Sequence, residues 1–154
     1  MRYVIDTNVL IHIIRNSTTW EYIDISFQPF DSSQNQTFIS FVSVAEILSI
    51  AKQLGWGQEK MNKLSTLFSD IEIVTVSNEA DDMLIQSYVE IDAHSQGKNS
   101  QIPLKKGESA KNMGKNDLWI AATAHSLQAD LITTDKDFVH LDTIFFKVHY
   151  VEQI

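Results

Sequence analysis

The chain has 154 residues, the size of one ordinary domain, and we expect residues 1–154 to form a single domain. Hydrophobic residues make up 44% of the chain and charged residues 21%, a balance that supports a packed core and excludes disorder as the main state. The absence of cysteine excludes disulfides, cysteine-ligated metal sites and a thiol nucleophile. The net charge of −8 excludes a generally basic surface for holding polyanions.

Targeting signals are also absent from the pattern. No apolar run approaches the roughly 18–20 residues of a membrane-spanning helix, and the apolar start Tyr3–Ile5 is interrupted at Asp6. We therefore expect a cytoplasmic protein with no signal peptide and no membrane association. The five histidines form no HExxH motif or close metal-ligand pair, which favours structural or solvated roles for them.

In the first half of the chain, short β-branched runs predict strands and apolar residues at helical spacing predict helices. Ser43 is expected to cap a helix because Glu46 follows it at the capping-box spacing. In chain order the pattern predicts a strand at Tyr3–Ile5, helices at Val9–Arg15 and Ser17–Ile25, a strand at Thr37–Phe41, a helix from Ser43 to Leu54 and a helix at Gln58–Phe68.

The second half continues the alternation. It predicts a strand at Ile71–Val76, a long helix from its cap Ser77 to about Ala93, a polar and basic loop at His94–Gly114, a helix from its cap Asn116 through Gln128, a strand at Leu131–Thr134 and a last strand at about Phe146–Val151. Strands that alternate with helices indicate an α/β fold with three α/β/α layers and a mostly parallel central sheet. Ligands of such sheets gather at the carboxyl ends of the strands.

Two acidic residues follow predicted strands directly. Asp6 comes after the first strand and Asp135 after Leu131–Thr134, so a parallel sheet would bring them to the same edge. Each has a simpler explanation when taken alone. Asp6 could only cap the next helix, and Asp135 with Asp137 could form a polar turn.

Two further acids lie on predicted helices. Asp117 shares a helix face with Ala121 and Ala124, and a carboxylate on that inward face is costly unless a cation or several donors satisfy it. The alternative is an aspartate in the first turn that the helix dipole favours. Glu46 projects away from the apolar stripe of its helix, so periodicity also permits an ordinary solvated glutamate.

Together these acids would crowd into one cleft, where carboxylates repel one another unless they take up protons or bind cations. Oxygen ligands without cysteine or paired histidine favour Mg²⁺ or Mn²⁺ over Zn²⁺. A pair of such ions can activate a water molecule and stabilise a leaving oxygen, which suits phosphoryl-transfer hydrolysis.

The acidic segments resemble a known family. In order, four of them are similar to the four acidic motifs of PIN-domain ribonucleases: Tyr3–Leu10, Ser43–Leu48, Asn116–Ala124 and Leu131–Phe138. The resemblance spans residues 2 to about 150, and more narrowly it is to VapC-type toxins of bacterial toxin–antitoxin pairs. Each motif alone is loose, but four in the same order are specific.

The resemblance implies an endoribonuclease that depends on Mg²⁺ or Mn²⁺. Carried over by position, it makes Asp6, Glu46, Asp117 and Asp135 the catalytic metal ligands, with Asp6 and Asp117 the firmest. Asp137 would replace or assist Asp135, while Thr7 and Thr133 would orient ligating carboxylates. It also implies an RNA substrate, a cognate antitoxin whose tail occupies the acidic groove, and a homodimer.

Two departures from the family pattern stand out. The fourth motif often carries arginine where Thr134 stands, so a substrate contact from that arginine is missing. The stretch His94–Gly114 is longer than in compact members. From Lys98 to Lys115, five lysines stand against the single acid Glu108. Our hypothesis is that these lysines contact RNA phosphates; the alternative is a solvated charged loop.

Two other functions remain open from the sequence. A carboxylate site that binds Mg²⁺ does not by itself specify RNA, so the chain could be a metal-dependent phosphohydrolase of a small phosphate ester. It could also be a catalytically silent PIN-fold binding module, although the presence of all four acids argues against that.

Overall fold

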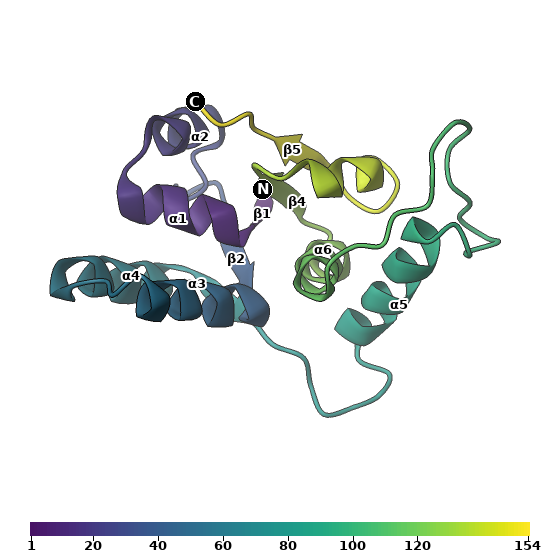
Figure 1. Cartoon of the computed structure of the whole chain (residues 1–154), viewed down its shortest axis with the longest axis horizontal. Coiled ribbons are helices and arrows are strands. Elements are labelled where there is room, and N and C mark those ends of the chain that lie inside the picture. Colours follow the sequence, from purple (N-terminus) through teal and green to yellow (C-terminus); the bar gives the residue numbers. More distant parts are fainter.

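Five parallel strands form one sheet in a computed structural model that describes all residues 1–154 (Figure 1). The strand order is β3-β2-β1-β4-β5, and β1 therefore lies at the centre, between β2 and β4. The strands are β1 (Arg2–Ile5), β2 (Gln36–Ser40), β3 (Glu72–Val74), β4 (Asp130–Thr133) and β5 (Val148–Tyr150). This arrangement confirms the predicted α/β fold with a parallel central sheet.

Helices cover both faces of the sheet (Figure 1). One face packs against α5 and α6, and the other packs mainly against α1, α2 and α4. The helices are α1 (Thr7–Arg15), α2 (Thr18–Phe27), α3 (Phe41–Gln53), α4 (Gln58–Asp70), α5 (Met83–Ser95), α6 (Lys115–Leu127) and the short 3₁₀ helix η1 (Lys136–Leu141).

The central strand β1 explains why both faces need covering. Val4 belongs to the core on the α6 side, whereas Tyr3 and Ile5 belong to the core on the α1 side. Successive side chains of a strand point to opposite faces of the sheet, so an uninterrupted apolar run must be covered on both faces. The three apolar residues before Asp6 thus fix the site's first acid at the edge of a doubly buried strand.

Two predicted helix starts are wrong. Helix α3 begins at Phe41 with Ser40 as its cap, because the Ser40 hydroxyl accepts the N–H of Val42, while Ser43 is fully buried inside the helix. Helix α5 begins at Met83 rather than just after Ser77, because Asp82 accepts the N–H groups of both Leu84 and Ser77. An aspartate offers two acceptor oxygens, and through them Asp82 caps α5 and also binds the backbone of Ser77, which keeps the segment from Ser77 to Asp82 outside the helix.

A third cap prediction also fails. Helix α6 begins at Lys115, its N-terminal cap is Gly114, and no side chain caps it. The segment between α5 and α6 forms no helix or strand, as expected, but His94 and Ser95 belong to the last turn of α5 and are buried. The remaining boundaries differ from prediction by at most two residues. None of the helices is long and apolar enough to cross a membrane.

Ile5 is fully buried in the central strand directly before Asp6. Replacing it with alanine removes apolar contacts and leaves a cavity, so we expect Ile5→Ala to lower the free energy of unfolding by about 2–5 kcal/mol and Ile5→Val by about 0.5–1.5 kcal/mol. Urea unfolding followed by circular dichroism measures both. Equal, negligible losses would contradict the assignment of Ile5 to the core.

Candidate metal centre

Asp6 occupies the carboxyl end of β1 and also caps α1. Its side chain accepts the N–H of Asn8 and the hydroxyl proton of Thr133, and only 3% of its surface is exposed. The backbone explains the second contact: Asp6 N–H donates to Ile132 O, which extends the β1–β4 ladder and sets Thr133 beside the carboxylate. Asp6 is therefore a helix cap and a buried acid at the same time.

Asp135 and Asp137 follow the neighbouring strand β4. The N–H of Asp135 donates to the Thr133 hydroxyl at 2.9 Å, and the Asp135 carboxylate accepts the N–H of Asp137 at 2.8 Å, which caps η1. Thr133 thus bonds to Asp6 with its proton and to Asp135 with its oxygen. This chain of hydrogen bonds fixes the two strand ends relative to each other.

Asp117 comes to the same place from the first turn of α6. It is half-buried, and no hydrogen bond satisfies its carboxylate. The preceding turn approaches closely, since a Cβ added at Gly114 would lie 3.0 Å from Oδ2 of Asp117. Asp117, Asp135 and Asp137 each offer one carboxylate oxygen, and these three oxygens lie within 4.8 Å of one another.

Glu46 is half-buried on α3 and is oriented by a hydroxyl. Thr7 Oγ1 lies 2.7 Å from Oε1 of Glu46 and 3.0 Å from Oγ of Ser43. A hydroxyl has one proton and a carboxylate only accepts, so Thr7 donates to Glu46 and accepts from Ser43. Ser43 does not cap α3 as predicted; it is hydrogen-bonded to Thr7, and its place one helical turn before Glu46 puts both residues on the same face of α3.

The structure groups the predicted acids unevenly. The tightest group is Asp117, Asp135 and Asp137, so Asp137 stands with Asp135 rather than in its place. Asp6 and Glu46 do not belong to that group of three, but their charges act on the same site. The charge of Glu46 raises the pKa of Asp117, and the charges of Asp117 and Asp135 raise the pKa of Asp6.

Burial and mutual repulsion both keep protons on this site. Burial raises the pKa of Asp6 to about 7, against hydrogen bonds from Thr133 and Asn8 that lower it. Burial, together with the charges of Asp135, Glu46 and Asp137, raises the pKa of Asp117 to about 6. Five carboxylates therefore share one site with no basic side chain paired to any of them.

This donor set fits a hard divalent cation. All five side chains offer carboxylate oxygens, with no sulfur or imidazole among them, and such sets suit Mg²⁺ or Mn²⁺ better than Zn²⁺. A cation would also remove the repulsion that now favours protonation. Asp117, Asp135 and Asp137 could hold one ion, while Asp6 and Glu46 could complete the site.

The raised pKa of Asp117 predicts a pH-dependent cost to stability in metal-free buffer. In the folded chain the group resists ionisation until about pH 6, whereas in the unfolded chain it ionises near pH 3.8. Its destabilising effect is therefore full above pH 6 and disappears below pH 3.8. With EDTA present, we expect Asp117→Asn to raise the free energy of unfolding by about 1–2 kcal/mol at pH 8. The gain is smaller than for a fully buried group because solvent screens the half-buried carboxylate. At pH 3.5 we expect no change in the free energy of unfolding.

Urea unfolding at several pH values measures this difference. Asp81→Asn is the matched control, because Asp81 is exposed and makes no hydrogen bond. A lower unfolding free energy for Asp117→Asn than for the unchanged chain at pH 8 would contradict the repulsion described here.

Comparison with solved structures shows where this fold recurs. A chain of VapBC2 from Rickettsia felis, solved bound to a DNA fragment from the promoter, is 20% identical with a TM-score of 0.73, and the match covers 99% of this chain and 100% of that one. A toxin–antitoxin complex from Klebsiella pneumoniae matches at 20% identity and a TM-score of 0.66, over 99% of each chain. A chain of VapBC-1 from nontypeable Haemophilus influenzae matches at 22% identity and a TM-score of 0.65, over 97% of this chain and 98% of that one.

No curated protein matches the chain significantly by sequence. The family model of the PIN domain, however, matches residues 3–144 and so includes all five acids of the site. The match agrees with the observed sheet and with the order of the acidic motifs. The chain belongs to the PIN domain family.

Proposed function

We propose that this chain is the endoribonuclease toxin of a bacterial VapBC-type toxin–antitoxin pair and that it hydrolyses RNA with Mg²⁺ or Mn²⁺. Asp6, Glu46, Asp117 and Asp135 would be its catalytic metal ligands, assisted by Asp137. The observation that carries the proposal is the convergence of these unpaired carboxylates from α3, α6 and two strand ends, two of them with raised pKa values. Membership of the PIN domain family supports a nuclease.

The surrounding residues have positioning roles in this proposal. When bound, the divalent ions supply activation of a water molecule and stabilisation of the leaving oxygen. Thr133 holds Asp6 and Asp135 at a fixed separation, and Thr7 orients Glu46 toward the site. Hydroxyl groups that orient ligating carboxylates raise metal affinity, since the ligands then lose less freedom on binding.

An antitoxin is the partner that we propose for the chain. The three structures compared above are described as VapBC or toxin–antitoxin complexes, and their chains match this one over almost their full length. An antitoxin segment with a basic residue could occupy the acidic site and compete with the metal. Formation of a homodimer stays a prediction.

Two alternatives make different predictions for substrate. A phosphohydrolase of small esters would hydrolyse p-nitrophenyl phosphate and leave an RNA oligonucleotide intact. A catalytically silent binding module would hydrolyse neither the phosphomonoester nor the RNA, but the presence of all five acids has no evident purpose in such a module. Cleavage of RNA without hydrolysis of the phosphomonoester is the result expected here.

We expect Asp6→Asn and Asp117→Asn each to lower Mn²⁺-dependent RNA cleavage at least 100-fold, because each removes a charged metal ligand from the site. Purified variants are compared on a mixed RNA pool, with circular dichroism to show that both remain folded. Asp81→Asn, which removes an exposed acid, should cleave normally. Full cleavage by either site variant would sink the proposal.

Metal binding itself is measurable without an activity assay. A ligand that binds only the folded chain stabilises it by about 2.7 kcal/mol at 100 times its dissociation constant. We expect saturating Mn²⁺ to raise the melting temperature of the unchanged chain by several degrees and to leave that of a doubly substituted Asp117→Asn, Asp135→Asn variant unchanged. Equal shifts in both proteins would place the bound ion elsewhere.

A further inference from the structure

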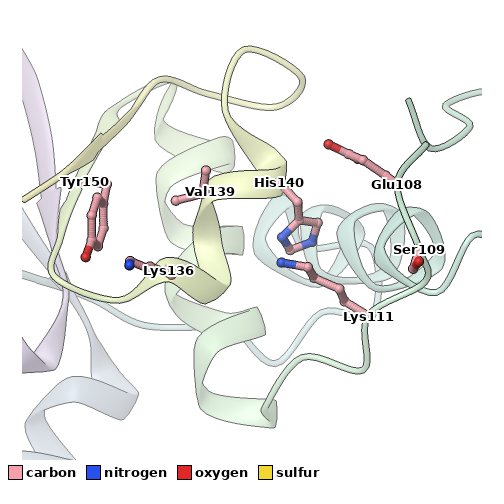
Figure 2. A pocket seen from close by; sticks show the side chains of 7 residues that line it. All are labelled: Glu108, Ser109, Lys111, Lys136, Val139, His140 and Tyr150. Atoms are coloured by element: carbon pink, nitrogen blue, oxygen red, sulfur yellow. The ribbon is translucent and has the colours of Figure 1, made fainter. Parts of the chain in front are cut away.

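A cavity of about 630 Å³ lies beside η1, between that helix, β5 and the segment that connects α5 to α6 (Figure 2). Its walls include Lys111 and Glu108 from the connecting segment, Lys136 and His140 from η1, and Tyr150 from β5. We call it the lysine–tyrosine pocket. Its volume falls within the range of about 300–1,000 Å³ typical of small-molecule sites.

The pocket adjoins the acidic site through the chain itself. Lys136 stands between Asp135 and Asp137, two acids of the candidate metal centre, and its side chain lines the pocket. A polymer lying across η1 could therefore contact the metal centre and the pocket together. A free small ligand would gain nothing from this adjacency, whereas a strand of RNA would.

The two lysines are available to an anion. Neither Lys111 nor Lys136 forms an ion pair within the chain. Figure 2 shows the ammonium end of Lys111 beside the His140 ring, and Lys136 Nζ lies 5.7 Å from the centre of the Tyr150 ring. In a chain of net charge −8, two unpaired cations in one pocket are a local reversal of sign.

The walls are tied to one buried residue. Ser95 at the end of α5 is fully buried; its carbonyl accepts the N–H of Lys111 at 2.6 Å, and its hydroxyl is hydrogen-bonded to Nε2 of His140 at 2.8 Å. The connecting segment and η1 are thus held against the same turn of helix. A pocket held in this way loses little conformational entropy when a ligand binds.

We propose that the lysine–tyrosine pocket binds a nucleotide of the RNA that flanks the scissile phosphate, with Lys111 and Lys136 on backbone phosphates and Tyr150 stacked on a base. Lysine contacts to phosphate give affinity that is independent of sequence, and an aromatic ring can stack on any base. This proposal rests on the proposed ribonuclease function. It also narrows the lysine hypothesis, because Lys111 alone among the five lysines of residues 98–115 lines the pocket.

The test measures binding rather than cleavage. A fluorescein-labelled single-stranded RNA 12-mer of mixed sequence is titrated by anisotropy at several salt concentrations, with every variant built on Asp117→Asn so that the RNA stays intact. We expect Lys111→Ala and Lys136→Ala each to weaken binding about fivefold to tenfold. Each should also reduce the slope of log affinity against log salt by about 0.7, the value for one lost phosphate contact on a single strand.

The other wall residues give opposite or salt-independent effects. Tyr150→Leu should weaken binding about fivefold without changing the salt slope, and Tyr150→Phe should bind normally, because stacking needs the ring alone. Glu108→Gln should strengthen binding, since it removes the pocket's only acid. Circular dichroism shows whether each variant is folded.

Two control lysines are matched to those of the pocket. Lys98→Ala removes a lysine of the same connecting segment that does not line the pocket. Lys60→Ala removes a lysine of α4 whose Nζ lies 5.6 Å from the centre of the Trp56 ring. Both should leave affinity and salt slope unchanged. An equal loss for Lys98→Ala and Lys111→Ala would show a diffuse charge effect and overturn the pocket.

The outcome separates this proposal from the one on which it rests. If the unsubstituted chain cleaves RNA while Lys111→Ala and Lys136→Ala bind RNA as well as the parent variant, the pocket proposal fails and the ribonuclease stands. If the unsubstituted chain neither binds nor cleaves RNA, the proposed function fails, and the pocket proposal fails with it.

Discussion

Crowding of four further carboxylates around the buried Asp6 is the constraint on which the site depends. Five acids converge at one edge of the sheet without a basic partner, so every nearby donor matters: the Thr133 hydroxyl, the Asn8 N–H and the Thr7 hydroxyl. These donors hold the acids in place, but they do not neutralise them, and the pKa of Asp6 remains near 7. Such a site is costly to fold, and a bound cation offsets that cost.

The fold makes this crowding unavoidable. Adjacent parallel strands end at the same edge, so the residues after β1 and β4 become neighbours although 128 positions separate Asp6 from Thr134. Val4 and Leu131 of these strands are buried in one apolar core and Ile5 and Ile132 in the other, and this packing fixes where the acids that follow the strands lie. The chemistry of the site is therefore set by the packing of residues that never touch a ligand.

Sequence patterns predicted the order of strands and helices because buried apolar runs and helical spacing are local signals. They placed Asp6 and Asp135 at one edge, since the topology follows from the alternation. They misplaced the caps of α3, α5 and α6, because several residues could cap each helix and tertiary contacts choose among them. They could not show that Asp137 joins Asp117 and Asp135, or that Lys111 and Lys136 line one pocket, since these positions depend on η1 and the connecting segment.

The alternation of charge along Asp135, Lys136 and Asp137 has a consequence for control of the protein. The short helix η1 and its cap Asp135 together carry two acids of the candidate metal centre and one cation of the neighbouring pocket. A 3₁₀ helix has poorer hydrogen-bond geometry than an α-helix. A binding partner that shifted η1 would move two acids of the candidate metal centre and the pocket's Lys136 in a single movement, so the acidic site and the pocket would change together.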